Sequence, residues 1–425
     1  MKTSVLLDHE PVADGGWMVH ALLRLEGEAP ENRDRVPLNL SLVLDRSGSM
    51  SGEKLEAARH AAAMLVRRLS PADTVSVVAF DDAVDVVAQP ATGDAQEALT
   101  ALIESIGPGG STNLSGGWLR GRDLAADNLR DGGVNRVLLL TDGQANVGIV
   151  EPKKLTGLCK QGVKKGVSTT TIGFGEDYDE DLLKAMADAG GGGTYYIEKV
   201  DQASGVFEEE LEGLLSIVAQ NVRVTVRPGA HADAVNVLHQ YPSHTQGDVL
   251  TLEVGDLYAR EPRRILIAIL LPPGSAAPGT VADVAQLTVT AHVLTPEGGV
   301  ELQEITIPVT LSPEEGGKAE PEIRKEILLV EAARRRQEAL EARDRGDYAS
   351  GAQSLREMRG IVAACPYSAD DATVREELAD LETMAASFDD HQLSAGDIKY
   401  MKQRAYSAHR SRRESVERYR RGKEG

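Results

Sequence analysis

Apolar runs alternate with amphipathic stretches between Pro37 and about Gln220. The runs LNLSLVLD, TVSVVAF, AVDVVAQP, NRVLLLTDG, STTTIGFG and GTYYIEK predict strands. The stretches between them have helical periodicity near 54–69, 95–106, 115–130, 152–165, 179–189 and 203–219. Because alternating strands and helices imply crossover connections, the pattern predicts a doubly wound, mostly parallel sheet that helices cover on both faces.

The pattern changes after Gln220. The segments NVRVTVRPG, AVNVLHQ, DVLTLEVGD, RRILIAILL, VAQLTVTAHVL and ELQEITIPVTL read as strands separated by Pro and Gly turns. Two similar strands, TSVLLD and WMVHALLRLEG, begin the chain and have no place in a parallel sheet. We therefore expect them to pair with the later strands, so that the α/β domain is inserted in one β-sandwich.

A third pattern follows the polar stretch SPEEGGKAEPE, which predicts a linker. Helical segments are expected near 322–345, 347–364, 369–388 and 396–419. The predicted chain is thus multidomain, with α/β, all-β and all-α parts. The boundaries are N-terminal sandwich strands at 1–35, the α/β domain at 36–220, the rest of the β-sandwich at 221–311, a linker at 312–321 and a helical C-terminal domain with a basic tail at 322–425.

Net charge and cysteine content exclude some classes of ligand and indicate a cellular compartment. A formal net charge of −20 argues against binding to nucleic acid or to anionic lipid. The only cysteines, Cys159 and Cys365, lie far apart, as in a protein of a reducing compartment. No apolar stretch approaches the roughly 18 residues of a membrane span, and Asp8 interrupts the first apolar run. We expect a cytoplasmic protein without a signal peptide or a membrane segment.

The C-terminal stretch 396–425 has the opposite charge balance, with ten Lys and Arg residues against four Asp and Glu residues. A basic helix that lies on the acidic body explains this composition, and so does a docking segment for a partner protein. Stacking of RNA bases on Tyr400, Tyr406 and Tyr419 is the less favoured hypothesis because the whole chain is acidic.

Oxygen-bearing side chains gather where predicted strands end, and a glycine-rich loop, GPGGSTNLSGG, contributes more of them. Ligands of open α/β sheets lie beyond the carboxyl ends of the strands. Two carboxylates with short hydroxyls, and with no thiol or imidazole, suit a hard divalent cation better than zinc; Mg²⁺ is the first choice and Mn²⁺ the second. The set comprises Asp45, Ser47, Ser49, Ser111, Thr112 and Asp142.

The motifs DRSGS, GGSTN and TDG resemble the metal-ion-dependent adhesion site of a von Willebrand factor A domain, in a protein of the bacterial cytoplasmic type. The resemblance covers roughly residues 36–220. It implies that an acidic side chain of a partner protein completes the metal coordination, and it does not imply catalysis, so we expect that the chain is not an enzyme. An AAA+ ATPase system of the MoxR type is a candidate partner. The ligands that it implies, direct or through water, are Asp45, Ser47, Ser49, Thr112 and Asp142.

Two alternatives remain, namely a metal-dependent hydrolase and a structural scaffold whose site holds no metal. Known catalytic motifs fit poorly. A haloacid-dehalogenase motif needs a second Asp where Ser47 stands. A P-loop needs G-x-x-x-x-G-K-[ST], whereas Gly48 and Gly52 are separated by only three residues. The segment GGSTN lacks the last Gly of a nucleophile elbow.

Other polar residues are expected to have ordinary roles. Asp81 and Asp82 follow a strand and are interpreted as solvated turn residues. His231, His239 and His244 lie in the β block without a metal-binding motif, and we expect exposed strand and turn positions for them.

Overall fold

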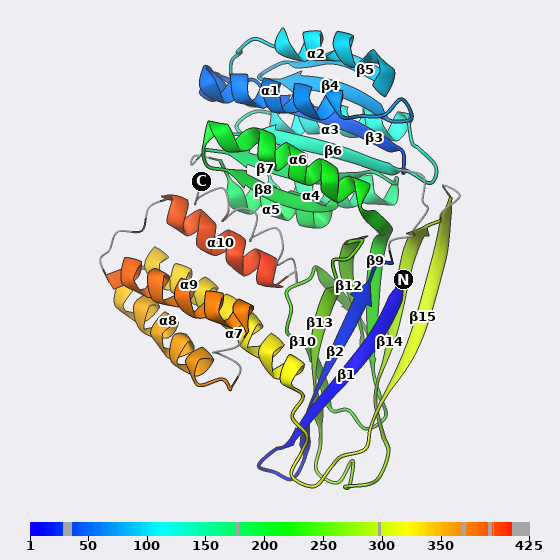
Figure 1. Ribbon diagram of the computed structural model, residues 1–425, viewed down its shortest axis with the longest axis vertical. Coiled ribbons are helices and arrows are strands. Elements are labelled where there is room, and N and C mark those ends of the chain that lie inside the picture. The colour runs from blue at the N-terminus through cyan, green and yellow to red at the C-terminus, as the bar shows by residue number, and fades with distance from the viewer. Residues whose placement is uncertain are drawn as a thin grey trace.

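The computed structural model describes residues 1–28, 36–143, 145–175, 178–295, 299–366, 371–389, 393 and 395–409. They form an α/β body, two packed antiparallel sheets and a helical body, at the top, lower right and lower left of Figure 1. The chain starts in the paired sheets, passes through the α/β body, returns to the sheets and ends in the helical body.

The α/β body is built on a six-stranded sheet of order β5-β4-β3-β6-β7-β8, in which only the edge strand β5 is antiparallel. Every residue of β3, β4 and β6 is buried, as expected for central strands covered on both faces. The strands are β3 (Leu38–Asp45), β4 (Thr74–Phe80), β5 (Val84–Thr92), β6 (Val134–Thr141), β7 (Ser168–Phe174) and β8 (Gly191–Ile197).

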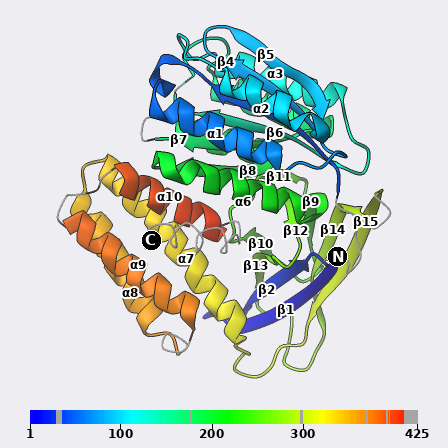
Figure 2. The same ribbon diagram turned by 45° about the horizontal axis from the view of Figure 1, so that its top comes forward.

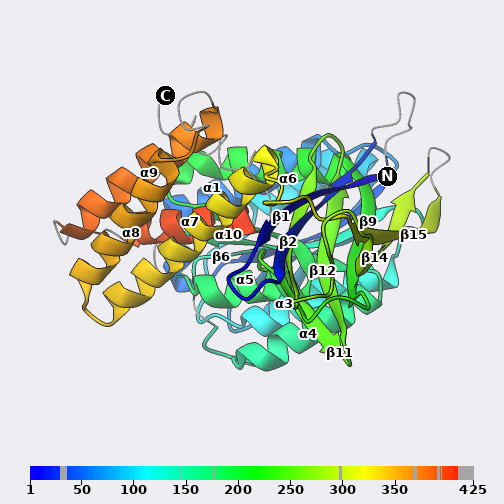
Figure 3. The same cartoon turned by 90° about the horizontal axis from the view of Figure 1, so that it is seen from below.

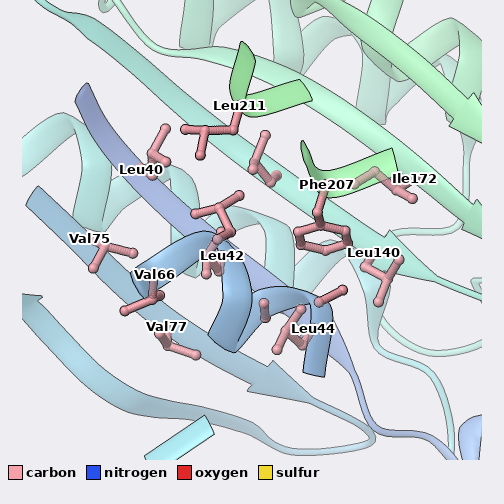
Figure 4. Close-up of a cluster of buried hydrophobic side chains, with 14 of the residues drawn as sticks. Leu40, Leu42, Leu44, Val66, Val75, Val77, Leu140, Ile172, Phe207 and Leu211 are labelled. Carbon is pink, nitrogen blue, oxygen red and sulfur yellow. The ribbon is translucent and has the colours of Figure 1, made fainter. Parts of the chain in front are cut away.

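Helices cover both faces of this sheet, which confirms the doubly wound architecture. Alternate residues of β3 divide between the faces: Leu42 belongs to the core that α1 and α6 cover, whereas Val43 belongs to the core that α3, α4 and α5 cover. Figure 4 shows the first of these cores, where Phe207 of α6 lies beside Leu140. The helices are α1 (Glu53–Arg67), α2 (Gln96–Glu104), α3 (Leu114–Asp127), α4 (Pro152–Lys164), α5 (Glu180–Ala189) and α6 (Ala203–Leu215), with 3₁₀ turns at η1 (Gly48–Met50), η2 (Gly93–Ala95) and η3 (Val200–Gln202).

The two antiparallel sheets form the predicted sandwich, with an aliphatic core between them. Strand β2 pairs along its whole length with β13, so that Leu23 faces Ile265. The N-terminal strands therefore complete a sheet made by later strands, and the α/β body is an insertion between them. One sheet contains β1 (Lys2–Pro11), β2 (Trp17–Glu26), β13 (Arg263–Leu271) and β10 (Ala234–Val237); the other contains β11 (Ser243–Gln246), β12 (Val249–Tyr258), β9 (Ile217–Pro228), β14 (Ala282–Leu294) and β15 (Val300–Leu311).

The helical body comprises α7 (Pro321–Asp344), α8 (Tyr348–Ala363), α9 (Ala372–Asp389) and α10 (Ala395–His409). It lies beside the sandwich in Figure 3, because the first turns of α7 pack on the outer face of the β2–β13 sheet. Ile323 contacts Leu22 and Leu266 there. None of the described helices combines the length and apolar character needed to cross a membrane.

His239 is buried in this contact, so the expectation of an exposed position is wrong for it. Its Nε2 lies 3.2 Å from Oε1 of Glu326 on α7, and its Nδ1 accepts a hydrogen bond of 3.0 Å from the Leu266 amide. The packing of α7 removes this histidine from water, which no local pattern indicates. His244 is exposed and His231 is partly exposed.

The stretch predicted as a linker, 312–321, is attached to the first strand. The amide of His9 donates to the Lys318 carbonyl at 2.9 Å, and the Lys318 amide donates back at 2.8 Å. The Glu320 amide donates to Asp8 Oδ2 at 2.8 Å, one residue before α7 begins. These bonds fix where the helical body leaves the sandwich.

Helix α10 lies between the rest of the helical body and the α/β body, as Figures 1 and 2 show. Met401 belongs to the helical core, whereas Lys402 pairs with Glu180 at the start of α5. The described part of the basic tail therefore lies on acidic residues of the same chain, in line with one of the two favoured hypotheses. Residues 410–425, with Tyr419, lie outside the described residues.

Candidate metal centre

The predicted ligands come from three segments at the carboxyl edge of the parallel sheet. Asp45 ends β3, and Asp142 directly follows the neighbouring strand β6. Thr112 lies in the loop between α2 and α3. Adjacent parallel strands end at the same edge, so residues almost 100 positions apart in sequence meet there.

Hydrogen bonds join the loop after β3 to the residues at the end of β6. The Ser47 amide donates to Asp45 Oδ1 at 2.8 Å, and the Ser47 and Ser49 hydroxyl oxygens are 3.2 Å apart. The Ser49 hydroxyl donates to Asp142 Oδ1 at 2.7 Å, while the Thr141 hydroxyl donates to Asp45 Oδ2. Four of the five predicted ligands thus form one continuous cluster of oxygen atoms.

Thr112 brings the fifth oxygen to the same cluster. A Cβ placed on Gly143 would lie 3.1 Å from Thr112 Oγ1 and 3.7 Å from Asp45 Oδ2, so both oxygens surround one small space. The Thr112 amide donates to Asn146 Oδ1 at 2.9 Å, and this bond holds the backbone of Thr112 in place. Its neighbour Ser111 is exposed. The structure therefore brings together all five residues that the resemblance implies.

The donor set fits a hard divalent cation. Asp45 and Asp142 are 0% and 1% exposed, and burial, with the Asp142 charge adding to it, raises the pKa of Asp45 above its ordinary value against the hydrogen bonds from Ser47 and Thr141. A bound cation would offset this cost. The described residues contain no group of three His, Cys, Asp or Glu suited to a metal; this site would instead combine two carboxylates with hydroxyls.

Asp81 holds the Thr112 loop, so the interpretation as a solvated turn residue is wrong for it. Its side chain is buried and accepts from the Ala83 amide at 2.8 Å and from Gly110 at 3.3 Å, and its carbonyl accepts from the Asn113 amide at 2.8 Å. A Cβ on Gly109 would lie 1.7 Å from Asp81 Oδ2, which explains the glycine. Asp82 is exposed.

Arg46 connects Asp81 to the loop that follows β3. Its guanidinium contacts Asp81 at 3.3 Å and Asp85 at 2.6 Å, and its carbonyl accepts from the Gly109 amide at 2.7 Å. Burial acts to raise the pKa of Asp81, but the bonds from Ala83, Arg46 and Gly110 outweigh it, and the pKa lies below its ordinary value. Asp81 and Arg46 are positioning residues, and the DRSGS spacing alone contains no sign of their contact.

Lys54 is the second group that sequence reasoning missed. It is the second residue of α1, and its Nζ lies 2.5 Å from Asp142 Oδ2. Both oxygens of Asp142 therefore have partners within the chain, one on Ser49 and one on Lys54. A lysine five residues after Ser49 carries no recognisable ligand pattern, so only the fold shows the contact.

Comparison with known proteins identifies the family. The sequence profile described as "von Willebrand factor type A domain" matches residues 39–209. The uncharacterized protein sll0103 of Synechocystis sp. is 30% identical over 292 residues, which are 65% of this chain and 69% of that protein. The chain belongs to the von Willebrand factor type A domain family. The matched residues contain the whole cluster described above.

A second relative of this von Willebrand factor type A protein and a solved structure extend the comparison. The uncharacterized protein YfbK of Escherichia coli is 32% identical over 190 residues, which are 44% of this chain and 33% of that protein, so the chain spans about a third of its length. The solved structure of von Willebrand factor type A from Catenulispora acidiphila has a TM-score of 0.67 at 19% identity and covers 94% of this chain and 89% of that one. At this identity the likeness shows the fold alone.

Proposed function

We propose that this von Willebrand factor type A protein is a divalent-metal-dependent protein-binding module. The observation that carries the proposal is the convergence of five side-chain oxygens from three segments at the carboxyl edge of the sheet. Mg²⁺ is the proposed ion, and Mn²⁺ is the alternative. The proposed ligands, direct or through water, are Asp45, Ser47, Ser49, Thr112 and Asp142.

The composition of the cluster favours binding over catalysis. Hydroxyl ligands are neutral and do not reduce the charge of the ion, and at most two carboxylates of the chain share it. A carboxylate from another protein is then a favourable further ligand. Hydrolysis would need a general base that is free to act beside the ion, but both carboxylates of the cluster are proposed as ligands, and its five residues include no histidine. We therefore propose that the chain is not an enzyme.

The proposed partner is a protein that presents an Asp or Glu side chain, and an AAA+ ATPase system of the MoxR type is one candidate. The proposed location is the cytoplasm. Cys159 and Cys365 are both buried free thiols, as is usual in a reducing compartment.

Calorimetry and a pull-down test the proposal together. Asp45→Ala and Asp142→Ala should each abolish the binding of Mg²⁺, because each removes a carboxylate from the site. A partner should be captured in Mg²⁺ and lost in chelator or with Thr112→Ala. Equal binding of metal by wild type and both Asp variants would contradict the metal site. Metal binding together with chelator-insensitive capture would contradict only the adhesion mechanism, and turnover of phosphoester or peptide substrates would favour the hydrolase.

A further inference from the structure

The ammonium group of Lys54 lies where a cation is needed. Its Nζ is 2.5 Å from Asp142 Oδ2, while the side chain is 30% exposed and reaches the cluster from the surface. Asp45, by contrast, pairs with no cation among the described residues and receives only amide and hydroxyl donors. Lys54 therefore compensates one of the two buried carboxylates from within the chain.

The same ammonium group lies close to the next loop of the edge. A Cβ placed on Gly175, which directly follows β7, would lie 3.4 Å from Lys54 Nζ. The carbonyl of Gly175 accepts a hydrogen bond of 3.3 Å from Lys399 of α10. Two lysines that are far apart in sequence thus approach one glycine: Lys54 from the proposed metal site and Lys399 from the helical body.

Lys399 is the buried centre of the α10 contact. It is 7% exposed, and its Nζ lies 3.7 Å from the ring centre of Tyr178 and 5.1 Å from that of Tyr196. Glu180 Oε2 is 3.8 Å away. A desolvated ammonium whose contacts include a carbonyl, two rings and a carboxylate oxygen responds to a change of charge nearby.

The rest of the α10 contact is also polar. Lys402 pairs with Glu180 and lies 3.5 Å from Asp181, and the Tyr406 hydroxyl donates to Asp188 Oδ1 at 2.9 Å. Contacts of this kind are individually weak when partly exposed. A modest electrostatic change beside Gly175 can therefore alter how firmly α10 docks.

We propose that Lys54 is an internal counter-ion of the metal site that couples metal binding to the docking of α10. The inference rests on the metal binding proposed above. Without metal, Lys54 balances Asp142. When a divalent cation binds Asp142, the Lys54 ammonium loses its compensating charge, positive charge around Gly175 increases, and Lys399 is held less favourably. By thermodynamic linkage, docked α10 in turn lowers the metal affinity.

Titration of the full chain with Mg²⁺ tests the first half of this proposal. Lys54→Met removes the competing charge and keeps the length of the side chain, so the affinity should rise by about tenfold or more. Lys399→Met should raise it severalfold, in the same direction. Lys164→Met, which removes an exposed charge at the far end of α4, should leave the affinity unchanged. Affinity that is equal or lower in Lys54→Met, with the control unchanged, would overturn the proposal.

Hydrogen exchange of residues 395–409 tests the second half. Mg²⁺ should speed amide exchange in α10 of the wild type, and this difference should shrink in Lys54→Met. Exchange that does not respond to Mg²⁺ in a wild type that binds the ion would overturn the coupling and leave the metal site standing. If neither wild type nor Lys54→Met binds Mg²⁺, this inference and the proposed metal site fall together.

Discussion

Two buried charged clusters at opposite ends of β6 differ in how the chain compensates them. At the start of the strand, the Arg136 guanidinium pairs with Asp256 of β12 and lies 3.7 Å from Glu210 of α6; all three side chains are at most 6% exposed. Thr170 bridges Arg136 at 2.9 Å and Glu210 at 2.7 Å. We call this set the junction cluster, because it joins the α/β body to the sandwich.

At the other end of β6 lies the metal cluster, formed by Asp45, Ser47, Ser49, Thr112 and Asp142. It also contains two buried carboxylates, but the lysine beside it, Lys54, is partly exposed and among the described residues forms an ion pair with Asp142 alone. Asp45 keeps a raised pKa, which burial causes. In the junction cluster one buried cation contacts both acids, whereas in the metal cluster Asp45 has no cation beside it among the described residues. Buried acidic pairs are structural where a cation of the chain contacts both acids, and they point to a ligand where one acid lacks such a contact.

The largest effect should come from breaking the junction cluster. Arg136→Met leaves Asp256 and Glu210 buried without their cation and should lower the free energy of unfolding by about 3–5 kcal/mol in urea denaturation. Arg223→Met is the matched control, since Arg223 pairs with Glu253 in an exposed contact, and it should cost less than about 1 kcal/mol. Equal effects of the two variants would mean that the junction cluster contributes little.

The metal cluster should behave in the opposite way. Asp45→Asn removes a buried charge without changing the shape of the side chain, so unfolding in chelator should change by less than about 1 kcal/mol. Its Mg²⁺ affinity should fall at least about a hundredfold, because a carboxylate ligand is lost. Loss of stability as large as in Arg136→Met, with metal affinity retained, would make the two clusters equivalent and the comparison void.

Thr112 supplies a neutral ligand, so its removal should matter less than that of Asp45. Thr112→Ala should weaken Mg²⁺ binding by about tenfold in calorimetry, which is the order expected for one oxygen ligand. Thr112→Ser retains the hydroxyl and should bind nearly as well as the wild type. If the serine variant is as weak as the alanine variant, the methyl group and not the hydroxyl is important at this position.

Asp81 should give the smallest effect, because it acts through the loop that bears Thr112. Asp81→Asn weakens the contact with Arg46 and should lower Mg²⁺ affinity by about threefold. Asp85→Asn also removes a partner of Arg46, but Asp85 is exposed, and this control should bind Mg²⁺ like the wild type. Equal affinity of both variants would show that the loop needs no support from Asp81.

The sequence predicts most of the fold because its strongest signals are local. Apolar runs define the central strands and helical patterns define α1 to α9 within a few residues, and the N-terminal strands, which have no place in a parallel sheet, indicate the insertion. The short strand β11 (Ser243–Gln246) has no apolar pattern and is fully exposed, so nothing in the sequence marks it. The contact of 312–321 with β1 likewise includes backbone bonds between His9 and Lys318, which any sequence can form.

The clustering of the five proposed ligands could be predicted because their spacing within two loops and at one strand end is itself the motif. Lys54, Asp81 and His239 could not, because their roles depend on partners 88, 29 and 87 residues away in sequence. The docking of Lys399 on Gly175, 224 residues apart, is of the same kind. Sequence patterns cannot identify residues that support the site when their partners lie on other elements of the fold.

The most direct test of the metal site is anomalous diffraction from crystals of the full chain grown with Mn²⁺. Mn²⁺ should replace Mg²⁺ at the same oxygen ligands and scatter anomalously. We expect one peak bounded by Asp45, Ser47, Ser49, Thr112 and Asp142, with the nearest oxygens at about 2.2 Å, and no such peak in Asp45→Asn crystals. If wild-type crystals at saturating Mn²⁺ show no peak in the cluster, and Lys54 still pairs with Asp142, this result would contradict the proposed metal site.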